Sequence, residues 1–385
     1  MAKNCRHVVV ALRMAGIAGQ DKLNGIFDYL SEGHRWNLSI HRTRHEFTAQ
    51  TVREEIDRGA DGFIVGIPGA DDALAELAKS TLPTVVMNID PSPLAKRHRS
   101  YLLVKGDARA VGVEAAHTLL SQGVYKSYGY AGYRTDDDWS RERGRHFRDA
   151  LAKAGFVGRM FDVAHYPDRT EDRETLAGWL RTLPKPCGIL AACDDRAYEI
   201  IDVCRDIGLR IPQEVGILGV NNDPILCENS DPKLSSIQPD FRREGYLAAQ
   251  ALDRGIRASH ILVGIRQVVH RESTYPLSNS GKLVQKALVF ISRNALRKVS
   301  VADVAANLKI SRSLLDLRFR ELQGETVHSA ILRLRLNEVK RRLANTADTI
   351  ERISADCGWA NVNSLKNAFR RATGKSMREW RATAG

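Results

Sequence analysis

The last quarter of the chain contains one pattern twice, about 50 residues apart. In its first half, Val301, Val304 and Leu308 are repeated 49 residues later by Ile350, Ile353 and Cys357. In its second half, Leu315, Phe319, Arg320 and Gly324 are repeated 50 residues later by Leu365, Phe369, Arg370 and Gly374. A repeat of this size indicates one supersecondary unit used twice. Because the offset grows by one residue, we expect the second copy to have the longer turn.

Each copy has the signature of a helix-turn-helix: a short apolar helix, a tight connection, and a second helix with basic residues that ends at glycine. The expected N-caps are Ser300, Ser311 and Thr349, and the expected C-terminal glycines are Gly324 and Gly374. An amphipathic helix over 327–343 joins the copies. Its basic residues are either close to phosphates or simply solvated.

The excess positive charge lies in the same region. From residue 280 onward there are 21 Lys and Arg against 9 Asp and Glu, whereas the upstream part has 37 of each. A basic domain attached to a neutral one is typical of proteins that bind the phosphate backbone of double-stranded DNA. On charge alone, a solvated charged surface is the alternative.

The second copy also carries a specific motif, I-x-x-I-S-x-x-C-G-W over 350–359, followed by L-x-x-x-F-R-R-x-x-G-x-S over 365–376. With the first copy, it resembles the DNA-binding domain of the AraC family. The resemblance implies that two recognition helices enter the major groove. The base-facing positions that it implies are Arg312, Ser313, Asp316 and Leu317 in the first copy, and Asn361, Asn363, Ser364, Lys366 and Asn367 in the second. We assign Leu315, Phe319, Leu365 and Phe369 to the core instead.

From residue 8 to about 276, short apolar runs alternate with amphipathic stretches, which predicts parallel sheets covered by helices. The expected strands are 8–12, 38–41, 62–66, 84–88, 102–104, 127–131, 160–164, 188–191, 215–220 and 267–270. The expected helices include 21–30, 71–80, 108–120, 141–154, 197–207 and 242–256. This number of strands predicts an α/β fold of two doubly wound lobes, with a ligand outside the carboxyl ends of the strands.

Polar residues gather where these strands end. The candidates are Arg13, Asp107, Asp194 and Asn221, together with Trp139, Arg141 and Arg143 at the start of a helix. Carboxylate, amide and guanidinium groups can hold several hydroxyl groups, and a tryptophan face can cover a sugar ring. The set indicates a carbohydrate site. For Asp107 and Asp194, a simple helix N-cap is the competing interpretation.

Three segments carry a second resemblance: DARAVGVEAA over 107–116, VGILGVNND over 215–223 and LSSIQPDFRREGY over 234–246. They resemble the effector domains of LacI-type repressors, which implies ligand contacts by Asp107, Arg143, Asn221 and Asp194. A LacI-type effector domain over 1–276 before an AraC-type domain over 277–385, with WSRER at 139–143 and DDR at 194–196, resembles the bacterial xylose-operon regulators. That resemblance implies a homodimeric activator controlled by a monosaccharide such as D-xylose, with RNA polymerase as a further partner.

Other classes have less support. No apolar run has the ~18 residues that cross a bilayer, and the six cysteines lack disulfide or zinc spacing, so we expect a cytoplasmic protein. No phosphate-binding or dinucleotide glycine motif follows a strand, so no cofactor is expected. An enzyme with Asp107, Asp194 or Asp195 as acid-base groups, or a transport-type solute-binding protein, remains the competing interpretation.

Overall fold

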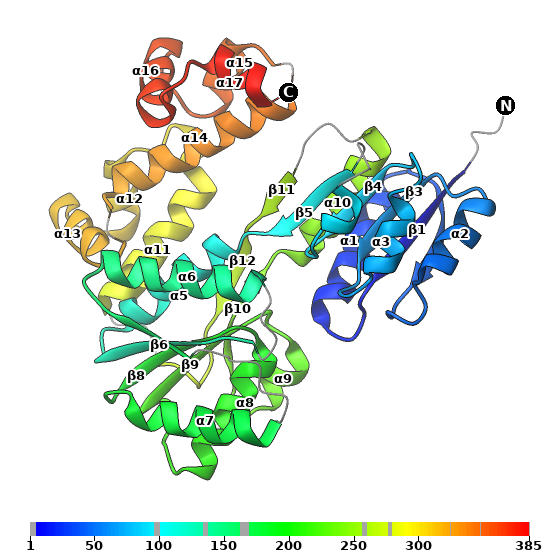
Figure 1. The fold of residues 1–385 in the computed structure, drawn as a ribbon. Helices are drawn as coiled ribbons and strands as arrows, with labels where there is room; N and C mark the ends of the chain where they lie inside the picture. The colour runs from blue at the N-terminus through cyan, green and yellow to red at the C-terminus, as the bar shows by residue number, and fades with distance from the viewer. Residues whose placement is uncertain are drawn as a thin grey trace. The chain divides into compact units, whose positions relative to one another are not determined.

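The computed structural model describes residues 5–95, 101–133, 138–161, 169–255, 260–275, 279–323, 325–346 and 348–384. The chain forms two compact units. The first comprises residues 1–115, 126–149 and 158–274, and the second comprises 116–125, 150–157 and 275–385. Two α/β lobes make up most of the first unit, and the C-terminal helices make up most of the second (Figure 1).

The first lobe is a six-stranded sheet in the order β11-β5-β4-β3-β1-β2, with all of its neighbours parallel. Its strands are β1 (Arg6–Leu12), β2 (Trp36–His41), β3 (Gly62–Gly66), β4 (Thr84–Met87), β5 (Tyr101–Gly106) and β11 (His260–Val263). Its helices are α1 (Ile17–Ser31), α2 (Ala49–Asp57), α3 (Asp71–Leu77), α4 (Ser92–Ala95) and α10 (Phe241–Arg254). Alternate residues of β1 belong to different hydrophobic clusters, so both faces of the strand are covered. This burial explains its continuous apolar sequence.

The second lobe repeats this plan in the order β12-β10-β9-β8-β6-β7. Its strands are β6 (Ser127–Ala131), β7 (Gly158–Phe161), β8 (Cys187–Ala191), β9 (Val215–Val220), β10 (Ser235–Pro239) and β12 (Ile265–Val269). Among these pairings, only that of β12 with β10 is antiparallel. The helices are α5 (Ala108–Gln122), α6 (Asp138–Lys153), α7 (Arg169–Thr182), α8 (Asp194–Asp206) and α9 (Pro224–Asn229).

The chain passes between the two sheets three times: from β5 into α5, from β10 into α10 and from β11 into β12. Backbone hydrogen bonds hold these passages side by side. The amide of Asp107 donates to the carbonyl oxygen of Val263 at 2.7 Å, and the amide of Asp240 donates to that of Gly264 at 3.1 Å. Asp107 therefore stands at a junction of the two lobes.

The predicted fold class of two doubly wound lobes followed by an all-α region is confirmed. Each of the ten predicted strands overlaps an observed one. Strand β7 begins at Gly158, two residues earlier than predicted, and residues 162–164 of the predicted strand lie outside the described residues. The prediction missed β10 and β11. The serines and proline of β10 give it little strand signal, and β11 has only four residues.

The C-terminal helices form two small cores. The helices are α11 (Asn279–Asn294), α12 (Val301–Leu308), α13 (Arg312–Gln323), α14 (Val327–Asn345), α15 (Ile350–Asp356), α16 (Val362–Thr373) and α17 (Met377–Ala384), with a 3-10 turn over Ala295–Arg297. The first half of α14 packs into the core of the first copy, and its second half packs into the core of the second. One long helix therefore joins the two repeats. The proposed domain boundary at 276/277 lies outside the described residues.

The structure confirms that the second turn is the longer one. Lys309 and Gly358 occupy left-handed backbone at the ends of α12 and α15. The N-cap Ser311 follows two residues after Lys309, whereas the N-cap Asn361 follows three residues after Gly358. Ser300 and Thr349 cap α12 and α15 as predicted, and Gly374 ends α16. Gly324 lies outside the described residues.

Candidate functional site

The start of α6 is fixed against strand β6. The hydroxyl of Tyr130 donates to the carbonyl oxygen of Ser140 at 2.7 Å, and the amide of Tyr133 donates to Ser140 Oγ at 3.0 Å. A side chain at Gly144 would meet the Tyr130 ring at 2.5 Å, so only glycine permits this close approach. These contacts fix the first turns of α6, the part of the helix that carries Arg143.

Arg143 is 8% exposed and donates a hydrogen bond to the carbonyl oxygen of Ala192, which follows β8. Its guanidinium carbon lies 5.0 Å from the centre of the Trp139 ring. Its Nε has no hydrogen-bond partner among the described residues. Burial lowers the pKa of Arg143, and Tyr130, Cys193 and Asp194 partly offset this shift. A buried cation with an unused donor can bind a further polar group.

The side chains on either side of Arg143 have other partners. Arg141 pairs with Asp138 on the exposed side of α6, and Glu142 Oε2 lies 3.4 Å from Lys105 Nζ. Among the described residues, Arg143 forms no ion pair with its helix neighbours Asp138 or Glu142 and donates toward β8 instead.

Asp194 is fully buried at the start of α8 and joins the loop after β9 to strand β10. Ser236 Oγ donates to its Oδ1 at 2.6 Å, and the amide of Asp223 donates to its Oδ2 at 2.8 Å. Burial raises its pKa from 3.8 to about 6, although these hydrogen bonds lower it in part. The N-cap interpretation is wrong for Asp194, since Cys193 occupies the N-cap position of α8.

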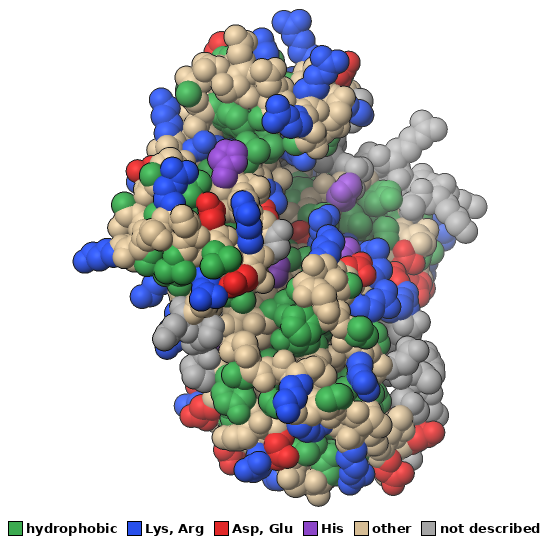
Figure 2. Space-filling view, turned by 90° about the vertical axis from the view of Figure 1, so that its left-hand side faces the viewer, with side chains coloured by type: hydrophobic (Ala, Val, Ile, Leu, Met, Phe, Trp, Pro, Cys, Tyr) green, Lys and Arg blue, Asp and Glu red, His purple; other side chains and the backbone are tan. Residues whose placement is uncertain are grey.

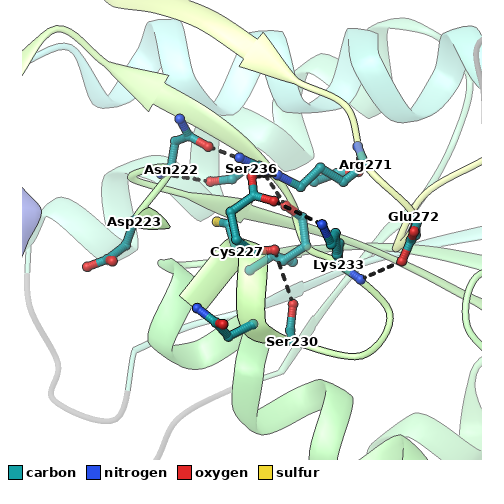
Figure 3. Close-up of polar contacts among 12 residues, drawn as sticks. Asn222, Asp223, Cys227, Ser230, Lys233, Ser236, Arg271 and Glu272 are labelled. Carbon is teal, nitrogen blue, oxygen red and sulfur yellow. Dashed lines mark hydrogen bonds and ion pairs between the residues drawn. The ribbon is translucent and has the colours of Figure 1, made fainter. Parts of the chain in front are cut away.

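Asn221 and Asn222 follow β9 with φ of 119° and 53°, which few residues other than glycine adopt. The Asn221 amide donates to the carbonyl oxygen of Ile237 at 2.8 Å. Arg271 Nη1 donates to the side-chain Oδ1 of Asn222 at 3.0 Å, and the backbone amide of Asn222 donates to Ser236 Oγ at 3.0 Å. Figure 3 shows Asn222, Ser236 and Arg271 meeting in this network. The loop that carries Asn221 is therefore firmly held.

In the first lobe, Asp107 caps α5: its Oδ1 accepts from the amide of Ala110 at 2.9 Å. The N-cap interpretation is confirmed for this residue, and a cap leaves the second carboxylate oxygen available to a ligand. Arg13 is exposed directly after β1. Both residues thus lie at the carboxyl ends of strands, as the sequence predicts.

A buried polar cluster next to Asp107 escaped the sequence analysis. Asn88 Nδ2 donates to Glu244 Oε2 at 2.5 Å, while Asn88 Oδ1 accepts from the amide of Gly106 at 2.8 Å. Lys22 Nζ lies 3.4 Å from the same Glu244 oxygen. Glu244 is 0% exposed, and burial raises its pKa. The cluster fixes the end of β5, one residue before Asp107.

The recognition helices carry most of their predicted base-facing residues on the surface. Those that are exposed are Arg312, Ser313, Leu317, Asn361, Asn363, Ser364, Lys366 and Asn367. Two of the predicted residues also have structural roles: Asp316 Oδ1 accepts from the amide of Val327 at 3.4 Å, and Asn361 Oδ1 accepts from the amide of Ser364 at 2.8 Å. The predicted core residues Leu315, Phe319, Leu365 and Phe369 are all 0% exposed.

The basic residues of α14 hold the domain together. Arg335 donates to the carbonyl oxygens of Ala295 at 2.7 Å and Val299 at 2.9 Å. Arg342 donates to Asp356 at 2.6 Å. The contacts of these two arginines tie α14 to both repeats and are not those of a simply solvated face.

Known families match both parts of the chain. The periplasmic binding protein-like domain matches residues 116–274, and the helix-turn-helix domain matches residues 304–383. Among the described residues, no helix is both long enough and apolar enough to cross a membrane.

Similar proteins cover both parts together. The chain is 28% identical over 389 residues to the xylose operon regulatory protein of Escherichia coli strain K12, covering 98% of this chain and 97% of that protein. It is 28% identical over 331 residues to the Haemophilus influenzae protein of the same name, covering 83% and 84%. The solved structure of the xylose-binding transcription activator XylR is 26% identical with a TM-score of 0.59, covering 100% of this chain and 99% of that one. The chain is therefore a XylR-like transcription regulator, in which a periplasmic binding protein-like domain precedes an AraC-type helix-turn-helix domain.

Proposed function

We propose that this regulator binds D-xylose or a closely related monosaccharide in its two lobes and that the sugar controls its affinity for an operator. The observation that carries this proposal is similarity over the whole length, through both domains, to regulators that are named for xylose. The architecture fits an activator whose DNA-binding domains respond to the state of the effector domain.

Arg143 and Trp139 supply the chemistry that a sugar needs. The buried guanidinium keeps an unused Nε–H, and the indole face beside it can pack against the apolar side of a pyranose ring. We infer that Arg13, Asp107, Arg141 and Asn221 complete the hydrogen bonding to the hydroxyl groups. Asp194 acts indirectly, because its hydrogen bonds hold the loops that follow β8 and β9 in place.

At the other end of the chain, exposed polar residues at the start of α16 face the major groove. Asparagine can pair bidentately with adenine, which makes Asn363 and Asn367 the strongest candidates for direct reading of bases. Two helix-turn-helix copies per chain and a homodimer would read repeated half-sites. We infer that the dimer acts in the cytoplasm, where the DNA is, and that RNA polymerase is its partner at the promoter.

The competing proposal is an enzyme that acts on the same sugar. Purified protein incubated with D-xylose separates the two, because a regulator returns the sugar unchanged while an enzyme depletes it. A thermal-shift screen of the full chain against a panel of pentoses and hexoses tests the ligand itself. We expect the largest rise in Tm with D-xylose. A panel in which no monosaccharide raises Tm would contradict the proposal.

A further inference from the structure

We propose that the first recognition helix, α13, reads thymine methyl groups in the major groove through Leu314 and Leu317. The inference rests on the proposed function, since it requires the C-terminal domain to bind double-stranded DNA. It concerns what kind of base contact each helix makes, which neither the fold nor the similar proteins specify.

Leu314 and Leu317 are unusually exposed for large apolar side chains, at 40% and 52%. They are three residues apart in a helix and therefore share one face. The amide of Leu314 donates to the N-cap Ser311 at 3.2 Å, which places Leu314 in the first turn and Leu317 in the second. These turns are the part of a recognition helix that reaches base edges.

The internal repeat allows these two positions to be compared with those of the second copy. At the offset of 50 residues, Leu314 corresponds to Ser364 and Leu317 corresponds to Asn367, and both of these polar residues are exposed. Buried positions of the two helices are conserved between the copies, as with Leu315 and Leu365. The two copies therefore present the same scaffold with different surface chemistry, apolar in α13 and polar in α16.

Two of the polar residues next to the leucines already have partners within the domain. Asp316 Oδ1 accepts from the amide of Val327, and Arg318 donates to Glu321 at 2.8 Å. In the major groove, the apolar group that a base edge offers is the C5-methyl of thymine. An apolar pair at base-facing positions thus matches thymine better than any other base.

The charge around the leucines fits DNA rather than a second protein surface. Arg312 and Arg320 on the same helix are exposed, and the C-terminal region has 21 Lys and Arg against 9 Asp and Glu. Figure 2 shows hydrophobic side chains interspersed with Lys and Arg over the part of the surface that the C-terminal helices form. Phosphates flanking the groove would be neutralised by these cations while the leucines reach the bases.

The test uses the full chain and an operator selected with it from a random duplex pool. Each thymine is replaced in turn by deoxyuridine, which lacks only the C5-methyl group. The Kd of wild type for the operator should rise about fourfold for each missing methyl that a leucine contacts, which corresponds to the free energy of burying one methylene group. Leu317→Ala should bind the thymine operator more weakly and no longer distinguish it from deoxyuridine at the affected position. Asn367→Ala, at the equivalent position of α16, should keep that distinction.

Equal binding of thymine and deoxyuridine operators at every position, with selection still successful, would overturn this inference and leave the proposed function intact. Failure to select any operator would instead overturn the proposed function. If Leu317→Ala changes self-association but not the thymine preference, the leucines form a protein contact and the inference is wrong. Unchanged circular dichroism and Tm establish that the variant is folded, which we expect because the side chain is half exposed.

Discussion

The guanidinium of Arg143 on α6 donates to the carbonyl oxygen of Ala192, the first residue after β8. This contact joins helix α6 to the segment that follows β8 at the carboxyl edge of the sheet. Among the described residues, no acidic side chain is hydrogen-bonded to the Arg143 guanidinium. Its N–H groups can therefore bind an uncharged ligand that is rich in oxygen atoms.

Replacing Arg143 by alanine should remove sugar binding. Hydrogen bonds to a charged group contribute about 1.5–3 kcal/mol, so the Kd for D-xylose should rise by about 10-fold to 150-fold. Titration calorimetry measures this loss directly. Arg145→Ala is the matched control, since Arg145 is exposed two residues further along α6 and should leave sugar affinity unchanged. Unchanged affinity in folded Arg143→Ala protein would show that the sugar binds elsewhere.

The buried carboxyl of Asp194 should give the first unit an unusual pH dependence. Its folded-state pKa of about 6 lies above its ordinary value of 3.8, so the folded protein holds the proton more tightly than the unfolded chain does. Stability from this group is therefore present at low pH and is lost as pH rises from about 4 through about 6.

Asp194→Asn should remove this loss. The free energy of unfolding of the variant relative to wild type should increase by about 2 kcal/mol between about pH 4.5 and about pH 7. Urea titrations at the two pH values measure the difference. A difference that is constant with pH would mean that Asp194 titrates normally in the folded protein.

The buried ion pair between α7 and α8 should matter far more than the exposed one beside it. Arg196 is 0% exposed and binds Asp172 through two hydrogen bonds, of 2.5 and 2.9 Å. Asp172→Ala leaves the buried charge of Arg196 without these two hydrogen bonds. It should therefore lower the free energy of unfolding by about 3–5 kcal/mol.

Asp206→Ala removes the exposed pair with Arg173 between the same two helices and should cost less than about 1 kcal/mol. Chemical denaturation of both variants compares the two pairs. A similar loss of unfolding free energy in both variants would contradict the prediction, because it would mean that water solvates the Asp172–Arg196 pair as it does the exposed pair.

Local features of the sequence predicted much of this molecule. The caps at Ser300, Ser311 and Thr349 and the glycine at Gly374 lie within a few residues of the groups that they satisfy, so sequence spacing was sufficient to find them. The ends of the buried strands were predicted for the same reason. Their apolar runs stop where the chain leaves the sheet.

Sequence patterns did not predict the contacts between segments that are far apart in the chain. The partners of Glu244 are Lys22 and Asn88, which lie more than 150 residues away in the sequence. Glu244 stands in the segment 234–246 that resembles LacI-type effector domains, but Lys22 and Asn88 belong to none of the motifs found in the sequence. Asp194 was placed correctly at a strand end, but its burial depends on Ser236 from a strand that the sequence did not predict. Side-chain direction follows from packing, which periodicity does not specify.

Two residues of α16 should separate base reading from backbone positioning. Asn363 is exposed in the first turn, so Asn363→Ala should cost about 1–3 kcal/mol on the operator and relax preference at one base pair. Arg370, later in the helix, should contact phosphate, so Arg370→Ala should weaken specific and random DNA alike and reduce the salt slope by about 1. Fluorescence anisotropy on both DNAs at several salt concentrations measures each effect. Equal losses on both DNAs for both variants would contradict this division.

Sugar control of DNA binding is the central claim. The decisive measurement is the Kd of the full chain for its selected operator at one fixed salt concentration, with and without saturating D-xylose. We predict that the sugar tightens binding by about 5-fold to 150-fold, the range of typical coupling free energies, and that Arg143→Ala binds the operator but does not respond to the sugar. An operator Kd that D-xylose leaves unchanged, in protein shown by calorimetry to bind the sugar, would contradict the account.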